Sequence, residues 1–257
     1  MSLPVLVINR DCDTDRWTAT RDSANTHGID PVRISAIDAH APDFDARPYA
    51  EIIAPTFWGR DTIKPGAFGC FLSHRAAWTH IVDHGWPAAL VLEDDADLIG
   101  MTDRVVQALS NCDLLFANDR MAEWANAVGV AGESAPLEPL IDALSEKGGP
   151  KAAGVRPAPG GDAYALTNAG AKRLLSVTAQ TRITCGVDWA IVWAALPRTA
   201  AFDGFEELGI LEQTTPRPDR PIDACVLTDP VARLRKAPSV LKHSVEVPIA
   251  HLVGTAS

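Results

Sequence analysis

Short apolar runs alternate with longer amphipathic segments along the first two-thirds of the chain. Pro4 to Ile8 is typical of a strand, a polar stretch and a helix follow to about Thr26, and Val32 to Ile34 is a second short strand. A strand, a helix and a second strand in this order predict parallel strands joined by a right-handed crossover. The opening of the chain therefore favours an α/β fold.

The alternation continues further along the chain. It predicts helices over Gly69 to His84, Thr102 to Ser110, Asn168 to Thr178 (with Asn168 near the cap) and Val187 to Leu196, and strands over Pro87 to Leu92, Asp113 to Ala117 and Ala163 to Leu166. Residues 38–65 fit an ordered loop or lid beside a site as well as a plain surface excursion. Residues 125–147 show no clear pattern, residues 148–161 form a Gly- and Pro-rich connection, and the tail from Asp203 is predicted to be mostly irregular.

One strand ends in a cluster of acids. The apolar run to Leu92 is followed directly by Glu93, Asp94 and Asp95, with Asp97 two residues further on. Ligands of parallel sheets collect at the carboxyl ends of the strands, where these acids fall. Like charges this close raise one another's pKa unless a cation neutralises them, and carboxylates suit Mg²⁺ or Mn²⁺ that also hold phosphate oxygens. The alternative is a solvated turn, or the cap and first turn of a following helix.

Composition limits the classes of protein that fit. The 257 residues suit a single domain. The 47% hydrophobic content supports a real core. A net charge of −10 argues against a nucleic-acid partner, and it requires a local cation wherever an anionic substrate binds.

The sequence favours a cytoplasmic protein. The first ten residues lack a basic secretory n-region, no apolar stretch reaches the ~20 residues of a membrane span, and the five cysteines are dispersed without a CxxC pair. A basic island, Arg233 to Lys236 followed by Lys242 and His243, is either a solvated face or a peripheral contact with the inner membrane near a lipid-linked acceptor.

A set of motifs runs along the chain: Val7-Ile8-Asn9, Arg16, Ser35-Ala36-Ile37-Asp38-Ala39, Gly69-Cys70-Phe71-Leu72-Ser73-His74, Trp78, Gly85, Leu92-Glu93-Asp94-Asp95, Ala163-Tyr164-Ala165-Leu166, Ala171-Lys172-Leu174-Leu175 and Val187-Asp188. Together they resemble glycosyltransferase family 25, the lipopolysaccharide-type galactosyl- and related transferases. One departure is Ala67, which stands where the family pattern Gly-Glu-x-Gly-Cys has an acid.

The resemblance implies a GT-A-like nucleotide-sugar-binding fold with a mainly parallel central sheet covered by helices. It also implies a UDP-sugar donor, a divalent cation and inversion at the anomeric carbon. Within the single domain, residues 1–120 are then the donor- and metal-binding half, and residues 160–257 are the acceptor-side half and irregular tail. On this basis Asp95 is the expected metal ligand, supported by Glu93 in a Glu-x-Asp motif, with Asp97 as an alternative ligand. Asp94 either contacts the donor or points away and caps the following helix.

Other residues are assigned to the donor and to catalysis. Asn9, Arg16, Asp38 and His74 are expected to contact the donor, and Arg10 is a weaker candidate. Solvated arginines, a turn-forming aspartate and a buried, hydrogen-bonded histidine are the alternatives. Asp188 is the candidate base, although helix capping competes with that role. Trp189 and Trp193 lie four apart and face either an acceptor sugar or, more simply, the core, and Tyr164 is expected to pack in the core or the sheet.

The function that fits is a metal-dependent inverting transfer of a hexose from a UDP-sugar to a saccharide acceptor. The resemblance favours galactose, with glucose next, in lipopolysaccharide or surface polysaccharide synthesis. Alternatives are a divalent-metal phosphohydrolase or nucleotidyltransferase, or a catalytically degenerate sugar-binding subunit. The glycine-rich basic loop of a nucleotidyltransferase is absent, since no glycine occurs between Ile8 and Gly28.

Overall fold

The computed structural model describes residues 3–100, 102–129, 132–140, 160–195, 222–235 and 245–253. Its strands are β1 (Val5–Asn9), β2 (Val32–Ser35), β3 (Thr62–Ile63), β4 (Ala88–Glu93), β5 (Ala96–Leu98), β6 (Leu114–Phe116), β7 (Ser134–Pro136), β8 (Ala163–Thr167), β9 (Ala224–Leu227), β10 (Ala232–Leu234) and β11 (Val247–Pro248). Its helices are α1 (Thr14–Asn25), α2 (Pro65–Asp83), α3 (Thr102–Ala108), α4 (Asp119–Ala127), α7 (Asn168–Thr181), α8 (Val187–Ala195), α10 (Ile249–Leu252) and the 3₁₀ turn η1 (Arg47–Tyr49).

A seven-stranded sheet in the order β2-β1-β4-β8-β6-β9-β7 forms the centre of the molecule. The β1 strand is parallel to β2 and β4, β6 is parallel to β9, and β8 is antiparallel to both β4 and β6. Five strands therefore point the same way, whereas β8 and the edge strand β7 run against them. The predicted α/β class with a mainly parallel sheet is confirmed, and the arrangement is consistent with a GT-A-like fold.

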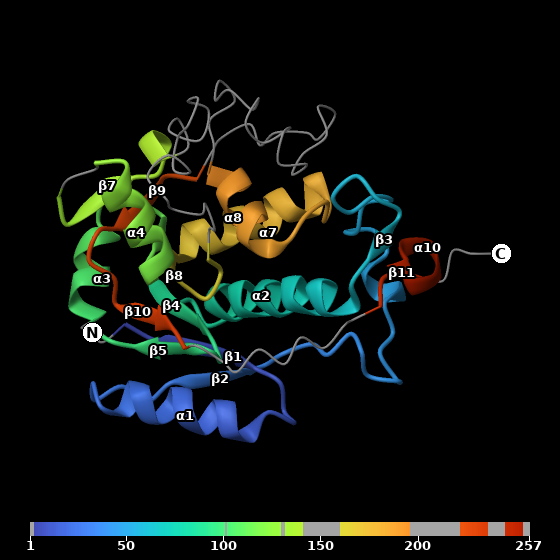
Figure 1. Ribbon diagram of the computed structural model, residues 1–257, viewed down its shortest axis with the longest axis horizontal. Helices are drawn as coiled ribbons and strands as arrows, with labels where there is room; N and C mark the ends of the chain where they lie inside the picture. Colours follow the sequence, from blue (N-terminus) through green and yellow to red (C-terminus); the bar gives the residue numbers. More distant parts are fainter. Residues whose placement is uncertain are drawn as a thin grey trace.

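Both faces of the sheet are covered, which explains the continuous apolar strands. In β1, Leu6 and Ile8 face the larger core cluster with α2, α7 and α8, whereas Val5 and Val7 face a second cluster with α3. Alternate residues of a strand point to opposite faces, so a strand covered on both sides must be apolar throughout. Figure 1 shows α2, α7 and α8 on one side of β1 and β2, and α1 on the other.

Helix boundaries differ from the prediction where capping decides them. The α2 helix begins at Pro65, four residues before the predicted Gly69, because proline is favoured in the first turn of a helix. The α7 helix begins at the predicted Asn168, next to its N-cap Thr167, whose side chain accepts from the backbone N–H of Gly170. The side chain of Asn168 instead bonds the last turn of α2 and the loop after it.

The tail is more regular than predicted. The β9 strand pairs with β6 inside the main sheet, β10 pairs with β5, and β11 pairs with β3. The prediction of a mostly irregular tail is therefore wrong for these segments. Strands of two to four residues show little alternation, and they form because partner strands supply their hydrogen bonds.

Residues 38–65 contain η1 and β3 among loops, and the unassigned residues 125–147 contain the end of α4 and the edge strand β7. Most of the predicted connection, residues 148–159, and the predicted helix end at Leu196 lie outside the described residues, as do Lys236, Lys242 and His243 of the basic island. Among the helices that the structure describes, none has the length and apolar character to cross a membrane.

Candidate active site

The ends of four central strands meet at one edge of the sheet. In the β1–β4 ladder Ile8 pairs with Glu93, and in the β4–β8 ladder Leu92 pairs with Ala163. Because β8 is antiparallel, the residues just before it lie beside the carboxyl ends of β1, β4 and β6. The acidic tip of β4 (Glu93, Asp94 and Asp95) and the segment 160–162 are thereby brought together, although almost seventy residues separate them in the sequence.

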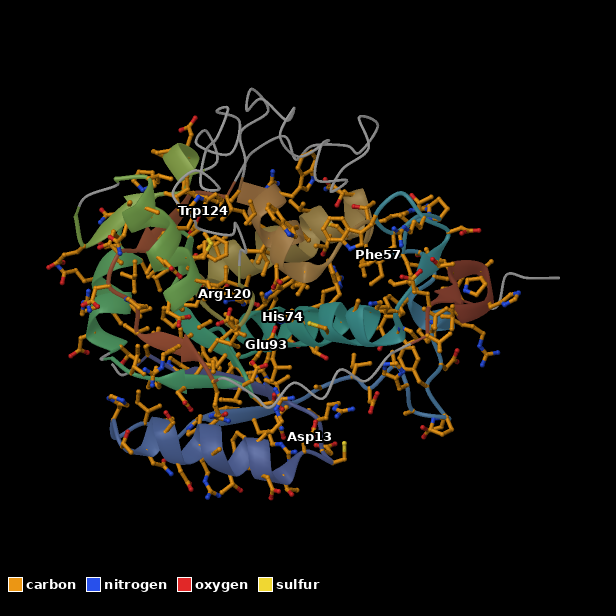
Figure 2. The ribbon with its side chains drawn as sticks, in the orientation of Figure 1. Asp13, Phe57, His74, Glu93, Arg120 and Trp124 are labelled. Atoms are coloured by element: carbon orange, nitrogen blue, oxygen red, sulfur yellow. The ribbon has the colours of Figure 1, made fainter. Side chains whose placement is uncertain are left out.

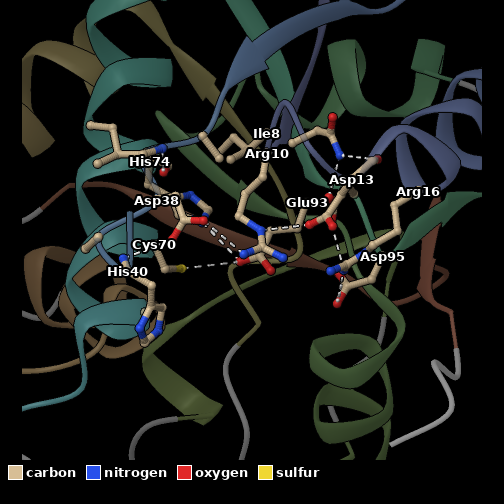
Figure 3. A pocket seen from close by; sticks show the side chains of 17 residues that line it. Ile8, Arg10, Asp13, Arg16, Asp38, His40, Cys70, His74, Glu93 and Asp95 are labelled. Atoms are coloured by element: carbon tan, nitrogen blue, oxygen red, sulfur yellow. Dashed lines mark hydrogen bonds and ion pairs between the residues drawn. The ribbon is translucent and has the colours of Figure 1, made fainter. Parts of the chain in front are cut away.

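A pocket of about 380 Å³ opens beside this edge. Figure 3 shows its side chains, which include the predicted donor and metal residues Asn9, Arg16, Asp38, His74, Glu93, Asp94 and Asp95 as well as Arg10, Asp13, His40 and Cys70. Two predicted residues, Asp97 and Asp188, do not line it. Seven of the nine predicted site residues therefore converge on one pocket from four separate segments.

Arg16 neutralises part of the acidic tip. Its Nη2 lies 2.6 Å from Oδ1 of Asp94 and 3.1 Å from Oδ2 of Asp95. Burial nevertheless raises the pKa of Asp95 to about 6, and the neighbouring charges of Glu93 and Asp94 add to this against the effect of Arg16. Oδ1 of Asp95 is buried and has no hydrogen-bond partner among the described residues. This carboxylate has an unsatisfied oxygen that a cation would satisfy.

Asn9 holds the tip in place. It is 1% exposed, and its side-chain amide donates to Oδ2 of Asp94 over 2.6 Å, while its carbonyl oxygen accepts from Nε of Arg33 over 2.9 Å. Burial is the main reason that the pKa of Asp94 is raised, although the bond from Asn9 opposes it. Asp94 does not cap a helix, because the element that follows is the strand β5. Both residues are structural supports of the pocket wall.

Asp38 and Arg10 face each other across the other side of the pocket. Nη1 of Arg10 lies 3.1 Å from Oδ2 of Asp38, and Nε of Arg10 lies 2.7 Å from Oδ2 of Asp13. The opposite oxygen of Asp38 accepts from the backbone of His40, so Asp38 also shapes a turn. Arg10 thus supplies a second cation at the pocket mouth.

His74 belongs to a buried chain of hydrogen bonds. Nε1 of Trp78 and Nδ1 of His74 each lie 2.7 Å from the hydroxyl of Tyr164, and Nε2 of His74 lies 3.1 Å from Oε1 of Glu93. Indole can only donate, so the tyrosine hydroxyl accepts from Trp78. An ionised carboxylate can only accept, so Nε2 of His74 donates to Glu93. These contacts match the alternative expectation for His74, which was a buried and hydrogen-bonded histidine.

Glu93 stays ionised in this arrangement. Burial acts to raise its pKa, but the hydrogen bond from His74 and the charges of Arg120 and Arg16 outweigh it, so the pKa is lowered. A carboxylate held in one orientation by a buried chain of hydrogen bonds is preorganised to face a cation.

Cys70, His74 and Glu93 form a group that the sequence analysis did not propose as a metal site. Their possible ligand atoms all lie within 4.8 Å of one another. Burial, followed by the charges of Glu93, Asp188 and Asp95, raises the pKa of the Cys70 thiol well above its ordinary value. A protonated thiol and a histidine whose Nε2 already donates make this group a poor metal site without rearrangement.

Asp97 does not line the pocket. It is on β5, and its Oδ1 accepts from Nε of Arg235 over 2.9 Å. Arg235 also donates through Nη1 to the backbone carbonyl of Asp94 and through Nη2 to the hydroxyl of Thr20. One cation of the basic island thus engages both Asp97 and the backbone of the acidic tip.

Asp188 approaches the site from the first turn of α8. Its Oδ1 accepts from the backbone N–H of Gly161 over 2.6 Å. Burial and the charge of Glu93 raise the pKa of Asp188 to about 6, although the Gly161 bond and the charges of His74 and Arg120 act in the opposite direction. A Cβ at Gly161 would lie 2.5 Å from Oδ1 of Asp188 and 3.6 Å from Oε1 of Glu93. Glycine is therefore the residue that lets these two carboxylates converge.

Arg120 and Asp162 are part of the site, although the sequence analysis gave neither residue a role. Nη2 of Arg120 contacts Oδ1 of Asp162, whose side chain is 2% exposed. Nε of Arg120 and Oδ2 of Asp162 are buried without partners among the described residues. Figure 2 shows Arg120 near His74 and Glu93. The sequence feature that could have indicated this part of the site is the pair Gly160-Gly161, which directly precedes an acid and a strand. The sequence analysis assigned this pair to a Gly- and Pro-rich connection.

The two tryptophans of α8 do not form an exposed sugar platform. Trp193 is 7% exposed within the larger core cluster, and Trp189 packs against that cluster. Tyr164 is fully buried within the chain of hydrogen bonds described above. All three aromatic residues therefore pack in or against the core, which was the simpler of the two expectations for the tryptophans.

Comparison with known proteins finds a similarity to one family. No curated protein matches the chain. Residues 2–124 match the model of glycosyltransferase family 25 (LPS biosynthesis protein), although the match stops short of Tyr164 and Asp188, to which the motif resemblance extends. These residues include Asn9, Arg16, Asp38, His74 and the acidic tip of β4. The chain is thus similar over residues 2–124, just under half of its length, to a family of glycosyltransferases.

Proposed function

We propose that the protein transfers a hexose from a UDP-sugar to a saccharide acceptor, with a divalent cation and with inversion at the anomeric carbon. The observation that carries this proposal is the convergence of Glu93, Asp95 and Asp188, with Arg16 and Arg120, at the edge of the sheet where its ligands are expected.

Glu93 and Asp95 are the proposed ligands of the cation, Mn²⁺ or Mg²⁺. They fit because both are carboxylates, because Asp95 has a buried oxygen without a partner in the described residues, and because burial, with the charges of Glu93 and Asp94, raises its pKa. When bound, such a cation neutralises the charge that develops on the leaving diphosphate. We leave Asp97 out of the ligand set because Arg235 engages it.

The pocket of about 380 Å³ is the proposed nucleotide site. Arg10 and Arg16 supply positive charge at its wall in a chain of net charge −10. Asp38, beside Arg10, is placed to accept a hydrogen bond from the ribose or the base. This arrangement supports binding of an anionic donor by a protein that otherwise repels it.

Asp188 is the proposed base that accepts the proton of the acceptor hydroxyl. A carboxylate with a pKa of about 6 is a stronger base than an ordinary aspartate and is still largely ionised near neutral pH. The bond from Gly161 leaves its second oxygen for that proton. Galactose as the transferred hexose, with glucose next, and work in the cytoplasm on a lipopolysaccharide or surface polysaccharide acceptor remain parts of this proposal.

The test is calorimetric titration of UDP with and without Mn²⁺. Asp95→Asn should lose the Mn²⁺-dependent part of UDP binding, whereas Asp97→Asn should retain it because Arg235 holds that residue elsewhere. The proposal fails if Asp95→Asn binds UDP with unchanged dependence on Mn²⁺. Release of UDP from UDP-galactose or UDP-glucose in the presence of acceptor then identifies the hexose.

A further inference from the structure

A second pocket, of about 440 Å³, lies on the other side of the first turn of α2. It is lined by Phe57, Trp58, Arg60, Thr62, Ile63, Lys64, Ala67 and Glu246. In that first turn Gly66 lines the nucleotide pocket and the next residue, Ala67, lines the second one. Figure 1 shows β3 and β11 beside this end of α2. The first turn of α2 thus contributes residues to both pockets.

Trp58 occupies a turn that does not favour tryptophan. The backbones of Phe57 and Arg60 exchange hydrogen bonds of 2.7 and 3.1 Å, and the two residues between them, Trp58 and Gly59, have φ values of 55° and 69°. Tight turns with two positive φ values favour Asn-Gly, and a bulky side chain is strained in the first position. The turn itself therefore does not account for the indole, which projects from a half-buried position into the pocket wall.

The turn is fixed to the segment that leads into Asp188. The backbone N–H of Trp58 donates to the carbonyl of Thr184 over 2.8 Å. A Cβ at Gly186 would lie 3.7 Å from the Cζ2 atom of the indole, so the ring lies next to this glycine. The ring of Phe57 meets the indole edge to face, with centroids 6.0 Å apart. The position of Trp58 is thereby tied to the start of α8, which carries the proposed base.

The rim of this pocket carries a positive excess. Glu246 contacts two other residues of the pocket. Its Oε2 accepts from the hydroxyl of Thr62 over 2.8 Å, and its Oε1 lies 3.8 Å from the largely exposed Arg60. Lys64 is exposed and has no ion-pair partner among the described residues. Two cations and one carboxylate therefore line a pocket in a chain that is strongly negative as a whole.

We propose that this pocket is the acceptor subsite, and that it binds a saccharide unit bearing an anionic group. The sugar ring stacks on the indole of Trp58, and its carboxylate or phosphate is held by Lys64 with Arg60. This inference rests on the proposed function, because it takes Asp188 as the base toward which the acceptor is directed.

Saturation-transfer NMR with galacturonic acid and galactose tests the subsite, because the two sugars differ only at the carboxylate. Wild-type protein should transfer saturation to galacturonic acid more strongly than to galactose, by about threefold. Trp58→Asn should reduce the transfer to both sugars by about tenfold. Asparagine suits the turn better than tryptophan, so this variant should unfold at or above the wild-type temperature. Lys64→Gln should remove the preference for galacturonic acid and keep the binding of galactose.

Calorimetry of UDP with Mn²⁺ on the same samples separates this inference from the proposed function. The expected result is UDP binding within about twofold of wild type in Trp58→Asn, since Trp58 does not line the nucleotide pocket. If UDP binds and Trp58→Asn still receives full saturation transfer, the subsite is wrong and the proposed function stands. If both sugars bind equally to wild type, the anionic preference is wrong. If UDP does not bind at all, the proposed function itself fails.

Discussion

The backbone N–H of Gly161 donates to Oδ1 of Asp188 over 2.6 Å, and the same oxygen would lie 2.5 Å from any Cβ placed on Gly161. That separation is shorter than two such atoms tolerate, so the hydrogen bond and a side chain at residue 161 are incompatible. The contact joins the segment before β8 to the first turn of α8, and it brings the proposed base next to Glu93.

Gly161→Ala should therefore disturb catalysis more than folding. Displacing Asp188 by a fraction of an ångström is expected to lower turnover by at least about tenfold. The affinity for UDP should change little, because residue 161 does not line the nucleotide pocket. Steady-state kinetics and UDP calorimetry measure the two effects. Gly186→Ala is the matched control, since its Cβ would make only an ordinary 3.7 Å contact. Equal turnover in both variants would contradict the expectation.

Asp188→Asn should remove the base and preserve the hydrogen bond from Gly161, because the amide oxygen can still accept. Transfer is expected to fall by about 10²–10⁴-fold, with UDP-sugar binding intact. In the wild type, turnover should rise with pH through about 6 as Asp188 loses its proton. The pH profile of kcat, measured in the same assay, checks this. A profile that is flat between pH 5 and 8, or a variant that retains turnover, would rule out the base role.

The raised pKa of Asp95 also predicts how stability depends on pH. Its pKa is about 6 in the folded protein against 3.8 for the free side chain, so the folded state holds this proton more tightly. Its contribution to stability is fully present below pH 3.8 and is lost as the pH rises through 6. Without metal, Asp95→Asn should therefore match wild type near pH 4 and exceed it at pH 7.5, by on the order of 1–2 kcal/mol.

Urea unfolding at the two pH values measures that difference. Adding Mn²⁺ at pH 7.5 should stabilise the wild type and not Asp95→Asn, because only the wild type keeps the carboxylate. A variant that is less stable than wild type at pH 7.5 without metal would show that the ion pair with Arg16 outweighs burial.

Tyr164→Phe should destabilise the protein through its neighbours. Removing the hydroxyl leaves Nδ1 of His74 and Nε1 of Trp78 buried without a partner, at a cost of about 2–4 kcal/mol in the free energy of unfolding. Urea unfolding measures it. Tyr49→Phe, at the other tyrosine of the chain, is the control, because Tyr49 is half-buried and stacks on Phe44. Similar losses of stability in the two variants would mean that the chain of hydrogen bonds through Tyr164 adds no stability beyond that of an ordinary tyrosine hydroxyl.

The sequence predicted the fold class because its evidence is local. Apolar runs such as Leu90 to Leu92 are buried on both faces, as expected for a covered parallel sheet. The acidic tip was also readable, since it follows such a run directly. The short strands of the tail were missed, because β9 exists through its pairing with β6 and not through its own pattern.

The sequence by itself thus determined the order of strands and helices, the family motifs and the position of acids at a strand end, because each depends on neighbouring residues. Only the tertiary structure decided which acids meet. In the folded protein Asp97 pairs with Arg235, Asp188 and Arg120 lie near Glu93, and Trp58 lies beside the start of α8. The physical reason is that strand pairing and the antiparallel direction of β8 join segments far apart in the chain.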